Sequence, residues 1–323
     1  MSELDLPAWV TSNVRIIDLS DRATWERERF NGLGASDAST VFGVNPYQDE
    51  YTLWAIKTGR MKPKLPTRTL KYGQINEQIV REAYEEDTGT TVWHRPNFMF
   101  QHETEDCLRY SPDGLVNELP RLFEAKTAKR NNEWRDEASD HAEAQVYTGM
   151  TVLGIPGVDA DIQLMLAGDA ENMERFTIPY NQTFIDTVFE TLVRWWHDHV
   201  VKDVAPMPDH RALNFLLEEH AESIPGSVLH VEKEQRREVL DALEQFKKGR
   251  SMVAKGEKIR DAGRARLVRI AGDYETVETT TGKELFTNRP HTVRRLSKGA
   301  LLRAGLNPED YKEETTVRSL RTN

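Results

Sequence analysis

A strand–turn–strand signal between residues 109 and 127 constrains this chain more than any other stretch. Two short apolar runs flank the turn-forming residues Asn117 to Pro120, as in two adjacent strands of a sheet. Side chains alternate between the two faces of a strand, so Glu124 and Lys126 are expected on one face. The alternate residues face the other way, toward a core. The sequence thus predicts a hairpin that carries an acid and an amine side by side.

A third polar residue, Asp113, lies at the Pro-Asp-Gly break that ends the first strand, where its carboxylate can reach Glu124. Two carboxylates that meet at one point repel each other unless a cation lies between them, and hard oxygen ligands suit Mg²⁺ or Mn²⁺. An amine such as that of Lys126 can hold or polarise a water beside such a metal, or stabilise an oxyanion. The stretch therefore indicates a phosphodiester-cleaving site. The simpler alternative is a hairpin with an exposed Glu–Lys pair, because E-x-K spacing is common.

The composition fits a soluble protein with a catalytic domain and a smaller appendage. The 323 residues are 38% hydrophobic and 30% charged, and no apolar run approaches the roughly 20 residues that span a bilayer. The acidic N-terminus lacks the order of a signal peptide. A single cysteine, Cys107, excludes an internal disulfide and a cysteine-rich zinc or iron–sulfur site. We expect a protein of the reducing cytoplasm, that of a bacterial host if the chain is phage-encoded.

Charge is unevenly spread along the chain. The net charge is −10, but from Val231 onward 21 Lys and Arg face 15 Asp and Glu, whereas the rest holds 22 basic and 38 acidic residues. A basic tail on an acidic body can still bind a polyanion locally. We expect a catalytic domain over residues 1–204, a proline-punctuated linker over 205–230 and an extension over 231–323. That extension either binds duplex DNA or packs against another subunit.

Periodicity and turn residues predict the remaining elements. Helices are expected at residues 20–30, 36–42, 51–58, 70–88, 138–150, 184–201 and 232–262. Short strands are expected at residues 90–93, 97–100, 108–111, 158–166, 174–178, 264–270, 274–279 and 291–296. Trp195 and Trp196 are interpreted as core residues rather than base-stacking platforms.

Four polar residues outside the hairpin are further candidates. A Gly-rich turn leads to Ser36 and Asp37, which are expected to form the N-cap of a helix whose free N–H groups favour a phosphate, with Arg29 as a forked clamp. Glu77 shares a helical stripe with apolar residues and so can face inward, where an acid needs a partner or a metal. His141 and Gln145 lie one helical turn apart and can address one ligand. In each case the alternative is structural: a plain helix cap, a solvated glutamate or a polar helix edge.

Together these segments resemble the lambda exonuclease and YqaJ-type viral recombinase family, a branch of the PD-(D/E)xK nuclease superfamily. Six blocks occur in the family's order and cover roughly residues 29–200. They are GLGASDA (32–38), YTLWAIKTG (51–59), YGQINE (72–77), SPDG (111–114), EAK (124–126) and AEAQVYTGM (142–150). The resemblance implies an α/β fold with a central mixed β-sheet flanked by helices.

The resemblance also implies roles for the hairpin residues. Asp113 and Glu124 match the metal-binding acids, and the backbone carbonyl of Ala125 would complete the shell. Glu77 matches a helix glutamate that acts at the second metal, partly through water, and Lys126 matches the catalytic lysine. Two Mg²⁺ ions per site are implied, for which Mn²⁺ can substitute.

A second set matches residues around the terminal 5′-phosphate of DNA: Arg29, Ser36, Ser111 and Gln145. Arg29 stands at the family's offset from Ser36, although the intervening residues differ. The family usually has a large aliphatic residue between the Glu and the Lys, where this chain has Ala125.

The activity implied by the resemblance is exonucleolytic digestion of one strand of linear duplex DNA, 5′ to 3′, which leaves 3′ single-stranded tails for phage-type recombination. A ring-shaped homo-oligomer and a single-strand annealing protein are the implied partners, with no membrane association. One alternative is a catalytically inactive DNA-binding or assembly protein on a nuclease fold. Another is an endonuclease of the same superfamily.

Overall fold

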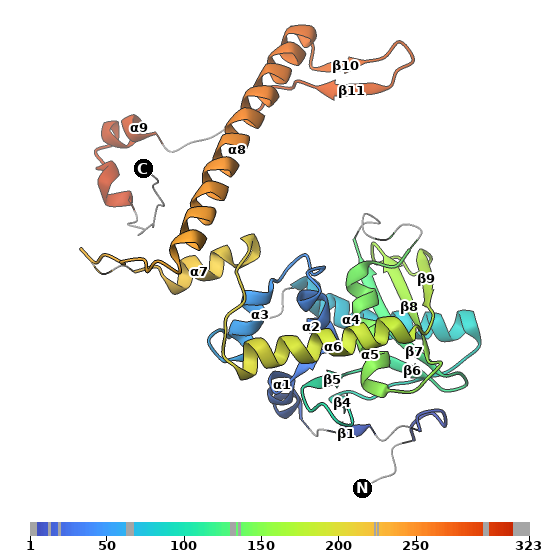
Figure 1. Ribbon diagram of the computed structural model, residues 1–323. Coiled ribbons are helices and arrows are strands. Elements are labelled where there is room, and N and C mark those ends of the chain that lie inside the picture. Colours follow the sequence, from blue (N-terminus) through green and yellow to red (C-terminus); the bar gives the residue numbers. More distant parts are fainter. Residues whose placement is uncertain are drawn as a thin grey trace. The chain divides into compact units, whose positions relative to one another are not determined.

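The computed structural model describes residues 5–11, 14–18, 21–62, 68–129, 134, 137–222, 224, 226–292 and 297–312. The chain divides into two compact units, Met1–Leu216 and Leu217–Asn323. The first unit has an α/β fold in which helices flank mixed sheets, as predicted (Figure 1). Its strands form two sheets rather than one central sheet.

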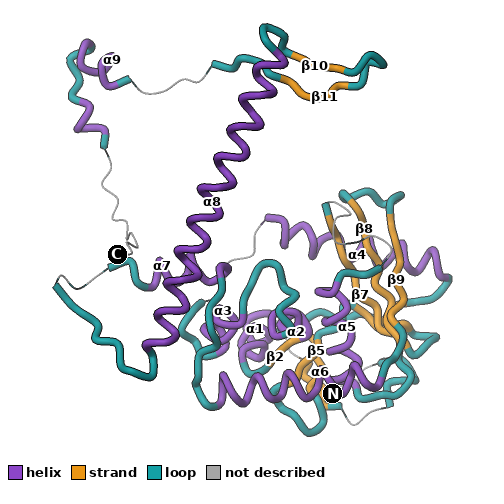
Figure 2. Tube along the Cα trace, turned by 45° about the horizontal axis from the view of Figure 1, so that its top comes forward, coloured by secondary structure: helices purple, strands orange, loops and turns teal. Residues whose placement is uncertain are grey.

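The five-stranded sheet contains the predicted hairpin. Its strands run in the order β3 (Val92–Trp93), β6 (Gly114–Val116), β7 (Arg121–Ala128), β8 (Asp159–Leu166) and β9 (Met173–Ile178). The β7–β8 pair is parallel and the other pairs are antiparallel. The long strands β7, β8 and β9 lie side by side in Figure 2. The hairpin predicted from the turn at residues 117–120 is therefore the β6–β7 pair. The prediction that Asp113 ends the first strand of this hairpin is wrong, because β6 begins at Gly114, directly after Asp113.

The parallel strands β7 and β8 are connected by a helical crossover. Parallel neighbours cannot be joined by a tight turn, and α5 (Asp140–Leu153) provides the connection. The Ser139 hydroxyl accepts a hydrogen bond from the Ala142 amide at the start of α5, and Gly154, with a φ of 62°, ends it. Helix α6 (Gln182–Trp195) packs against α5.

Helix α4 (Arg68–Thr88) contacts β7 and β8 through a separate apolar cluster. Val80 and Tyr84 are buried there with Phe123, and the Tyr84 and Phe123 rings lie 4.9 Å apart between centroids. Burial of an aromatic pair of this kind is a large part of what fixes a helix on a sheet. The alternate residue Phe123 thus faces a core, as the strand pattern predicts.

The second sheet has four strands, in the order β1 (Arg15–Asp18), β4 (Phe98–Gln101), β5 (Leu108–Tyr110) and β2 (Leu33–Gly34). Strand β5 directly precedes the Pro-Asp-Gly break, and β6 directly follows it. Because β5 and β6 belong to different sheets, the chain passes from one sheet to the other at this break.

Two short helices, α1 (Arg22–Phe30) and α2 (Ala35–Val41), contact strand β2 of the second sheet, and a third, α3 (Glu50–Lys57), contacts α2. The predicted helix at 184–201 is α6 followed by a π-helical turn, Trp196–Val201. Trp195 is buried and its indole N–H donates to Glu50 at 2.7 Å, while Trp196 is half-buried against the core. Both tryptophans are therefore core residues, as predicted.

A short 3₁₀ turn, His210–Ala212, leads into α7 (Leu213–Glu219), which spans the boundary between the units. The second unit then has a long helix α8 (Arg236–Ala271), a hairpin of β10 (Thr276–Glu278) and β11 (Glu284–Thr287), and α9 (Lys298–Arg303) with the 3₁₀ turn Pro308–Tyr311. The strand predicted at residues 264–270 is wrong, because α8 continues through it. The strand predicted at residues 291–296 lies largely outside the described residues.

In the described part of the chain, no helix has the length and apolar character needed to cross a membrane.

Candidate functional site

The three hairpin residues converge. The Asp113 carboxylate accepts a hydrogen bond from the Ala125 amide at 3.0 Å, and the Lys126 amine lies 2.6 Å from the Glu124 carboxylate. Strand β6 begins at Gly114, so the Asp113 side chain takes a backbone donor of β7 beyond the point where β6 pairs with it. We call Asp113, Glu124 and Lys126 the acid–lysine cluster.

A glycine is required beside Asp113. A Cβ atom at Gly114 would lie 2.2 Å from a methyl carbon of Val92 and 3.2 Å from the Phe123 ring. Only a residue without a side chain lets β6 come this close to β3 and β7. The glycine of the Pro-Asp-Gly break therefore fixes where the Asp113 carboxylate lies.

Gln145, on α5, completes one side of the cluster. The Lys126 amine donates to its amide oxygen at 2.5 Å, and its amide nitrogen lies 3.4 Å from Nε2 of His141. The predicted one-turn spacing of His141 and Gln145 thus brings both to the same place. Burial, followed by the positive charge of Lys126, lowers the pKa of His141 to about 4, so this imidazole is neutral near pH 7.

Burial raises the pKa of both acids. Glu124 is only 6% exposed, and burial together with the charge of Asp113 raises its pKa to about 7. Burial raises the pKa of Asp113 to about 6, a shift that Lys126 opposes and Glu77 reinforces. Burial acts to lower the pKa of the Lys126 amine, but the charges of Glu124 and Asp113 outweigh it, so the pKa is raised. The Lys126 amine is therefore a cation beside two carboxyl groups whose pKa values are raised.

Glu77 lies near this cluster. The residue is half-buried on α4, and burial followed by the charge of Glu124 raises the pKa of its carboxyl group. Even so, among the residues described by the structure, no three His, Cys, Asp or Glu side chains are gathered closely enough to hold a metal ion. The structure thus brings Asp113 and Glu124 into one cluster and leaves Glu77 beside it.

Tyr110 lies close to Glu124 and Asp113, and the sequence analysis did not identify it as a site residue. Its hydroxyl is buried without a hydrogen-bond partner among the described residues. Burial, then the charges of Glu124 and Asp113, raise its pKa well above the usual value. A Cβ at Gly149 would lie 2.7 Å from the Tyr110 ring, so the glycine of α5 makes room for it. An aromatic residue in a short strand is typical of a core, and only the three-dimensional position shows the orphaned hydroxyl.

The two other phosphate-site candidates meet each other. The Arg29 guanidinium donates to the Ser36 hydroxyl at 3.1 Å and lies 4.8 Å from the centre of the Trp25 ring. Both Arg29 and Ser36 are exposed. The predicted cap is correct for Asp37, whose carboxylate accepts a hydrogen bond from the amide of Gly34, the N-cap of α2, at 2.9 Å. It is wrong for Ser36, because the helix starts at Ala35, before Ser36.

The Arg29–Ser36 pair does not contact the acid–lysine cluster, although the helices that carry Ser36 and Gln145 pack together. Helix α2, which carries Ser36, packs against α5, which carries Gln145. Within the described ranges, no hydrogen bond or ion pair joins Arg29 or Ser36 to the acid–lysine cluster. Ser111 is half-buried, and the structure gives no hydrogen bond for its side chain there.

A buried lysine supports the Arg29 end of this region. The Lys57 amine is 2.7 Å from the Asp37 carboxylate, 2.7 Å from the Gly32 carbonyl and 2.9 Å from the Arg29 carbonyl. These three acceptors use all three N–H bonds of an ammonium group. Apart from a lysine at the end of a predicted helix, no local pattern indicates this role.

Comparison with known proteins gives a family match over the same region. Residues 24–155 match the model of the YqaJ-like viral recombinase domain. The protein YqaJ of Bacillus subtilis (strain 168), itself uncharacterised, is 27% identical over 197 residues, which cover 58% of this chain and 59% of that protein.

Two solved structures are also similar. An alkaline exonuclease (LHK-Exo) from Laribacter hongkongensis is 16% identical, with a TM-score of 0.47, over 62% of this chain and 98% of that one. A phage-related exonuclease from Haemophilus somnus 129PT is 9% identical, with a TM-score of 0.40, over 54% of this chain and 96% of that one.

The matched region holds Arg29, Ser36, Glu77, the acid–lysine cluster and Gln145. The similarity to the YqaJ-like viral recombinase domain therefore extends over residues 24–155 of this chain.

Proposed function

We propose that the first unit is a metal-dependent exonuclease that hydrolyses phosphodiester bonds of one strand at the ends of linear duplex DNA, 5′ to 3′, and leaves 3′ single-stranded tails. The observation that carries this proposal is the acid–lysine cluster, in which the Asp113 carboxylate, just before the β6–β7 hairpin, meets Glu124 and Lys126 on β7. The match to a viral recombinase domain over the same residues supports a role in recombination.

The cluster suits a divalent cation by the chemistry of its atoms. Asp113 and Glu124 offer hard carboxylate oxygens, and repulsion between them contributes to holding the pKa of Glu124 at about 7. The buried, unpartnered hydroxyl of Tyr110 marks a polar space beside them. We propose that Asp113, Glu124 and the Ala125 carbonyl would hold Mg²⁺, with Glu77 at a second ion and Mn²⁺ as a substitute. Bound ions of this kind polarise a phosphate and lower the pKa of an attacking water.

Lys126 has the properties of a donor rather than a base. Its pKa is raised by Glu124 and Asp113 against the effect of burial, so the amine is protonated. An ammonium group fixed by Glu124 and Gln145 can donate a hydrogen bond to a water or to a developing oxyanion. In this mechanism Lys126 orients the water and stabilises charge. It does not remove a proton while both acids remain ionised beside it.

Arg29 and Ser36 would bind the 5′-phosphate of the DNA end. The guanidinium and hydroxyl are adjacent and exposed, and a forked guanidinium suits a phosphate. Gln145, one helix away, would connect this phosphate to the cluster through its contact with Lys126, and Ser111 is proposed for the same role. Contacts of this kind set the register of the strand without reading its bases.

The test uses linear duplex DNA with a 5′-phosphate on one strand, Mg²⁺ and the full chain. Wild-type protein should release nucleotides from that strand, while Lys126→Ala and Asp113→Asn should lower the rate by at least about a hundredfold, the scale of a lost electrostatic or acid–base contribution. Asp203→Asn, at an exposed ion pair with Arg60, is the matched control and should keep full activity. Equal release by wild type and both site variants would refute the assignment.

Closed circular DNA separates the two alternatives. An endonuclease of the same fold linearises the circle, whereas an end-dependent exonuclease leaves it intact. A catalytically inactive DNA-binding protein degrades neither substrate. We further propose a ring-shaped homo-oligomer and a single-strand annealing protein as partners, which sedimentation and co-purification would test.

A further inference from the structure

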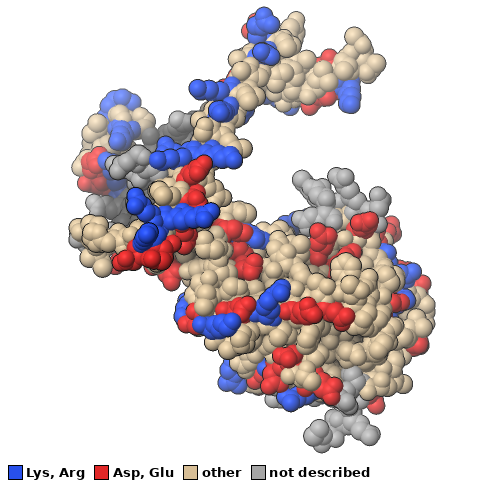
Figure 3. All heavy atoms as spheres, viewed as in Figure 1, with Lys and Arg blue, Asp and Glu red and all other residues tan. Residues whose placement is uncertain are grey.

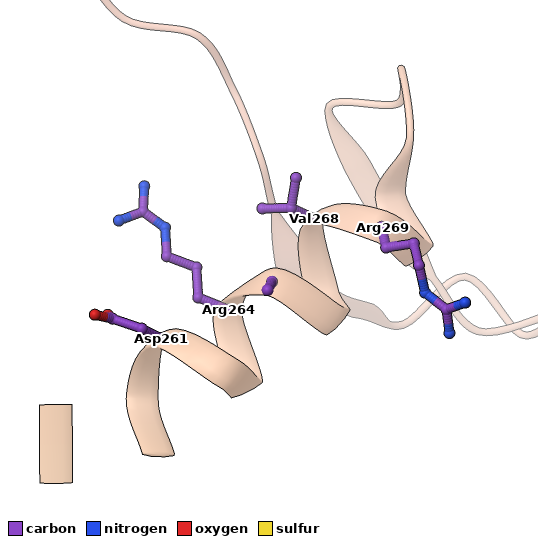
Figure 4. Close-up of a pocket in the computed structure, with 5 residues that line it drawn as sticks. Asp261, Arg264, Val268 and Arg269 are labelled. Carbon is purple, nitrogen blue, oxygen red and sulfur yellow. The ribbon is translucent and has the colours of Figure 1, made fainter. Parts of the chain in front are cut away.

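Arg109, on β5, is a basic residue that is buried rather than solvated. Figure 3 shows many Lys and Arg side chains at the surface of the molecule. Arg264 and Arg269, for example, extend from α8 in different directions at an open recess that this helix alone borders (Figure 4). Arg109 is only 7% exposed. Arginine is rarely buried unless a partner compensates for its lost hydration, so the partner indicates the purpose of the burial.

The partner of Arg109 is Glu28, near the end of α1. The Arg109 guanidinium donates through Nη1 to the Glu28 backbone carbonyl at 2.6 Å, and the same nitrogen lies 2.6 Å from the Glu28 carboxylate. The hydrogen bond from Arg109 is the largest cause that lowers the pKa of the Glu28 carboxyl group, so this group is ionised near pH 7. Arg109 therefore holds both the backbone and the side chain of one helical residue.

This contact fixes the backbone next to the proposed phosphate ligand, because Glu28 directly precedes Arg29. The last carbonyls of a helix need partners from outside the helix, and cations suit its negative end. Arg109 takes the carbonyl of Glu28, and Lys57 takes that of Arg29 at 2.9 Å. Two buried cations thus hold the last turn of α1, while the Arg29 side chain itself is exposed.

The turn after α1 leaves room for this arrangement. A Cβ atom at Gly32 would lie 3.0 Å from Nε of Arg109 and 2.6 Å from the carbonyl oxygen of Cys107. Only a residue without a side chain lets the turn approach β5 so closely. Strand β2 then pairs in parallel with β5, with Gly34 opposite Arg109. The end of α1 is therefore attached to β5 through Arg109 as well as through backbone pairing.

The same strand leads directly to the acid–lysine cluster. Strand β5 ends at Tyr110, and Asp113 follows Arg109 by four residues, at most about 14 Å of extended chain. Pro112 fixes its own φ and restricts the residue before it, so this short segment has little freedom. The Asp113 carboxylate is held in turn by the Ala125 amide at 3.0 Å. One short segment thus joins the residue that anchors α1 to a proposed metal ligand.

We propose that Arg109 is a positioning residue for the 5′-phosphate: it fixes Arg29 to the strand that leads to Asp113 and so makes binding and hydrolysis depend on a phosphorylated end. This inference rests on the proposed function and deepens it. Arg109 does not contact the DNA, because it is buried, and it acts through Glu28 and Arg29. A merely structural ion pair would affect stability without affecting the choice between DNA ends.

The test uses a hairpin duplex with one open end, which carries either a 5′-phosphate or a 5′-hydroxyl, and the full chain. The phosphate preference is the ratio of the two affinities, measured by fluorescence anisotropy in EDTA, and the ratio of the two kcat/KM values in Mg²⁺. Wild type should prefer the phosphate by about tenfold or more, the scale of a charged hydrogen bond. Arg109→Met should lower both ratios by at least about fivefold, while the rate on the 5′-hydroxyl end changes by less than about threefold.

A double variant shows whether Arg109 acts through Arg29. Arg29→Ala should abolish the phosphate preference, and Arg29→Ala/Arg109→Met should lower it no further. A further decrease in the double variant would overturn the proposal. Arg121→Met is the matched control, because Arg121 also pairs with a carboxylate, that of Asp161 at 3.0 Å, but in the other sheet. This control should leave the phosphate preference within about twofold of wild type, and an equal effect of Arg109→Met and Arg121→Met would overturn the proposal.

Glu28→Ala separates positioning from the electrostatic field. Removing an anion beside Arg29 would by field alone raise the preference for a phosphate, whereas loss of the Arg109 contact should lower it by at least about twofold. An unchanged or increased preference would overturn the proposal. Because Glu28 is only half-buried, this variant also provides the test if Arg109→Met fails to fold.

The two readouts separate this proposal from the proposed function. Wild type that prefers the phosphorylated end in EDTA but hydrolyses neither duplex would refute the exonuclease, and the affinity ratios would still decide the role of Arg109. Wild type that hydrolyses both ends equally and binds them equally would overturn the role of Arg109 and leave the exonuclease supported.

Discussion

Replacing Lys57 with methionine tests how the Arg29–Ser36 region, the proposed phosphate-binding end, is held. Methionine keeps an apolar stem of similar length and removes only the charged group. In the native chain this amine is 5% exposed and is surrounded by the Asp37 carboxylate and the carbonyls of Arg29 and Gly32 at 2.7 to 2.9 Å. Burial lowers the pKa of the amine, and Asp37 opposes that shift. The substitution leaves a carboxylate that is only 13% exposed without its cation.

The expected cost follows from that burial. Removing one partner of a buried ion pair destabilises a protein by about 3–5 kcal/mol, because the other charge stays buried. The two carbonyls also lose a donor, but these losses overlap with the first and are not added to it. For a domain of this size, each kcal/mol shifts Tm by about 2–4 °C, so Lys57→Met should lower Tm by about 6–20 °C. The Arg29 carbonyl is released as well, so binding of a 5′-phosphate should weaken before catalysis fails.

Thermal and urea unfolding of the full chain measure the effect. Asp203→Asn, which removes one charge of the exposed Arg60–Asp203 pair, should cost less than about 1 kcal/mol. The double variant Lys57→Met/Asp37→Asn should cost less than the sum of its parts, because neither charge is then left buried alone. This account of the buried Lys57–Asp37 pair would be refuted by a Lys57→Met protein whose free energy of unfolding is within about 1 kcal/mol of wild type. It would also be refuted by a double variant whose cost equals the sum of the two single costs.

Three other predictions follow from packing and ionisation. Gly114→Ala should destabilise the protein by about 1–3 kcal/mol, because the added Cβ would lie 2.2 Å from Val92. Gly249→Ala in α8, where a Cβ would have no atom within 4 Å, should stabilise it by up to about 1 kcal/mol. Urea unfolding should show these opposite signs, and equal effects of the two substitutions would contradict the packing described here. Cys107 is buried with a pKa of about 11, so it should resist alkylation at pH 8 until the protein is unfolded, and rapid labelling of folded protein would exclude this. In EDTA, the raised pKa of Glu124 (about 7) means that the folded state holds a proton that the unfolded state loses, so its contribution to stability declines as pH rises from about 4.5 through 7. The stability of Glu124→Gln relative to wild type should therefore rise by at most about 1.4 kcal/mol per pH unit across that window, and a difference independent of pH would refute the shift.

The hairpin was predictable because its signals are local. Alternation along β7 places Glu124 and Lys126 together, and turn residues at 117–120 set the strand pairing. By contrast, the 264–270 segment contains Leu, Val and Ile at close spacing, and that pattern does not distinguish a strand from the end of a long helix. Strand β2 has only two residues and pairs with a strand some seventy residues away, so no local signal marks it.

The candidate site was predictable to the same extent. Contacts within one hairpin or one helical turn, such as Glu124 with Lys126 and His141 with Gln145, follow from geometry. Tyr110 and Lys57 acquire their significance from burial among residues distant in the sequence, which composition and spacing do not reveal. The start of α2 was placed at Ser36 rather than Ala35, although the predicted capping group Asp37 does satisfy the backbone at the first turn.

Because the chain passes from one sheet to the other at Asp113, the proposed nuclease activity depends on the alignment of two separately hydrogen-bonded layers. Any slippage between these layers, for example on mild heating, displaces one acid relative to its neighbours on β7 while leaving most backbone pairing intact. Enzymatic rate should consequently disappear several degrees below the loss of ellipticity, and a ligand bridging both layers should close that interval.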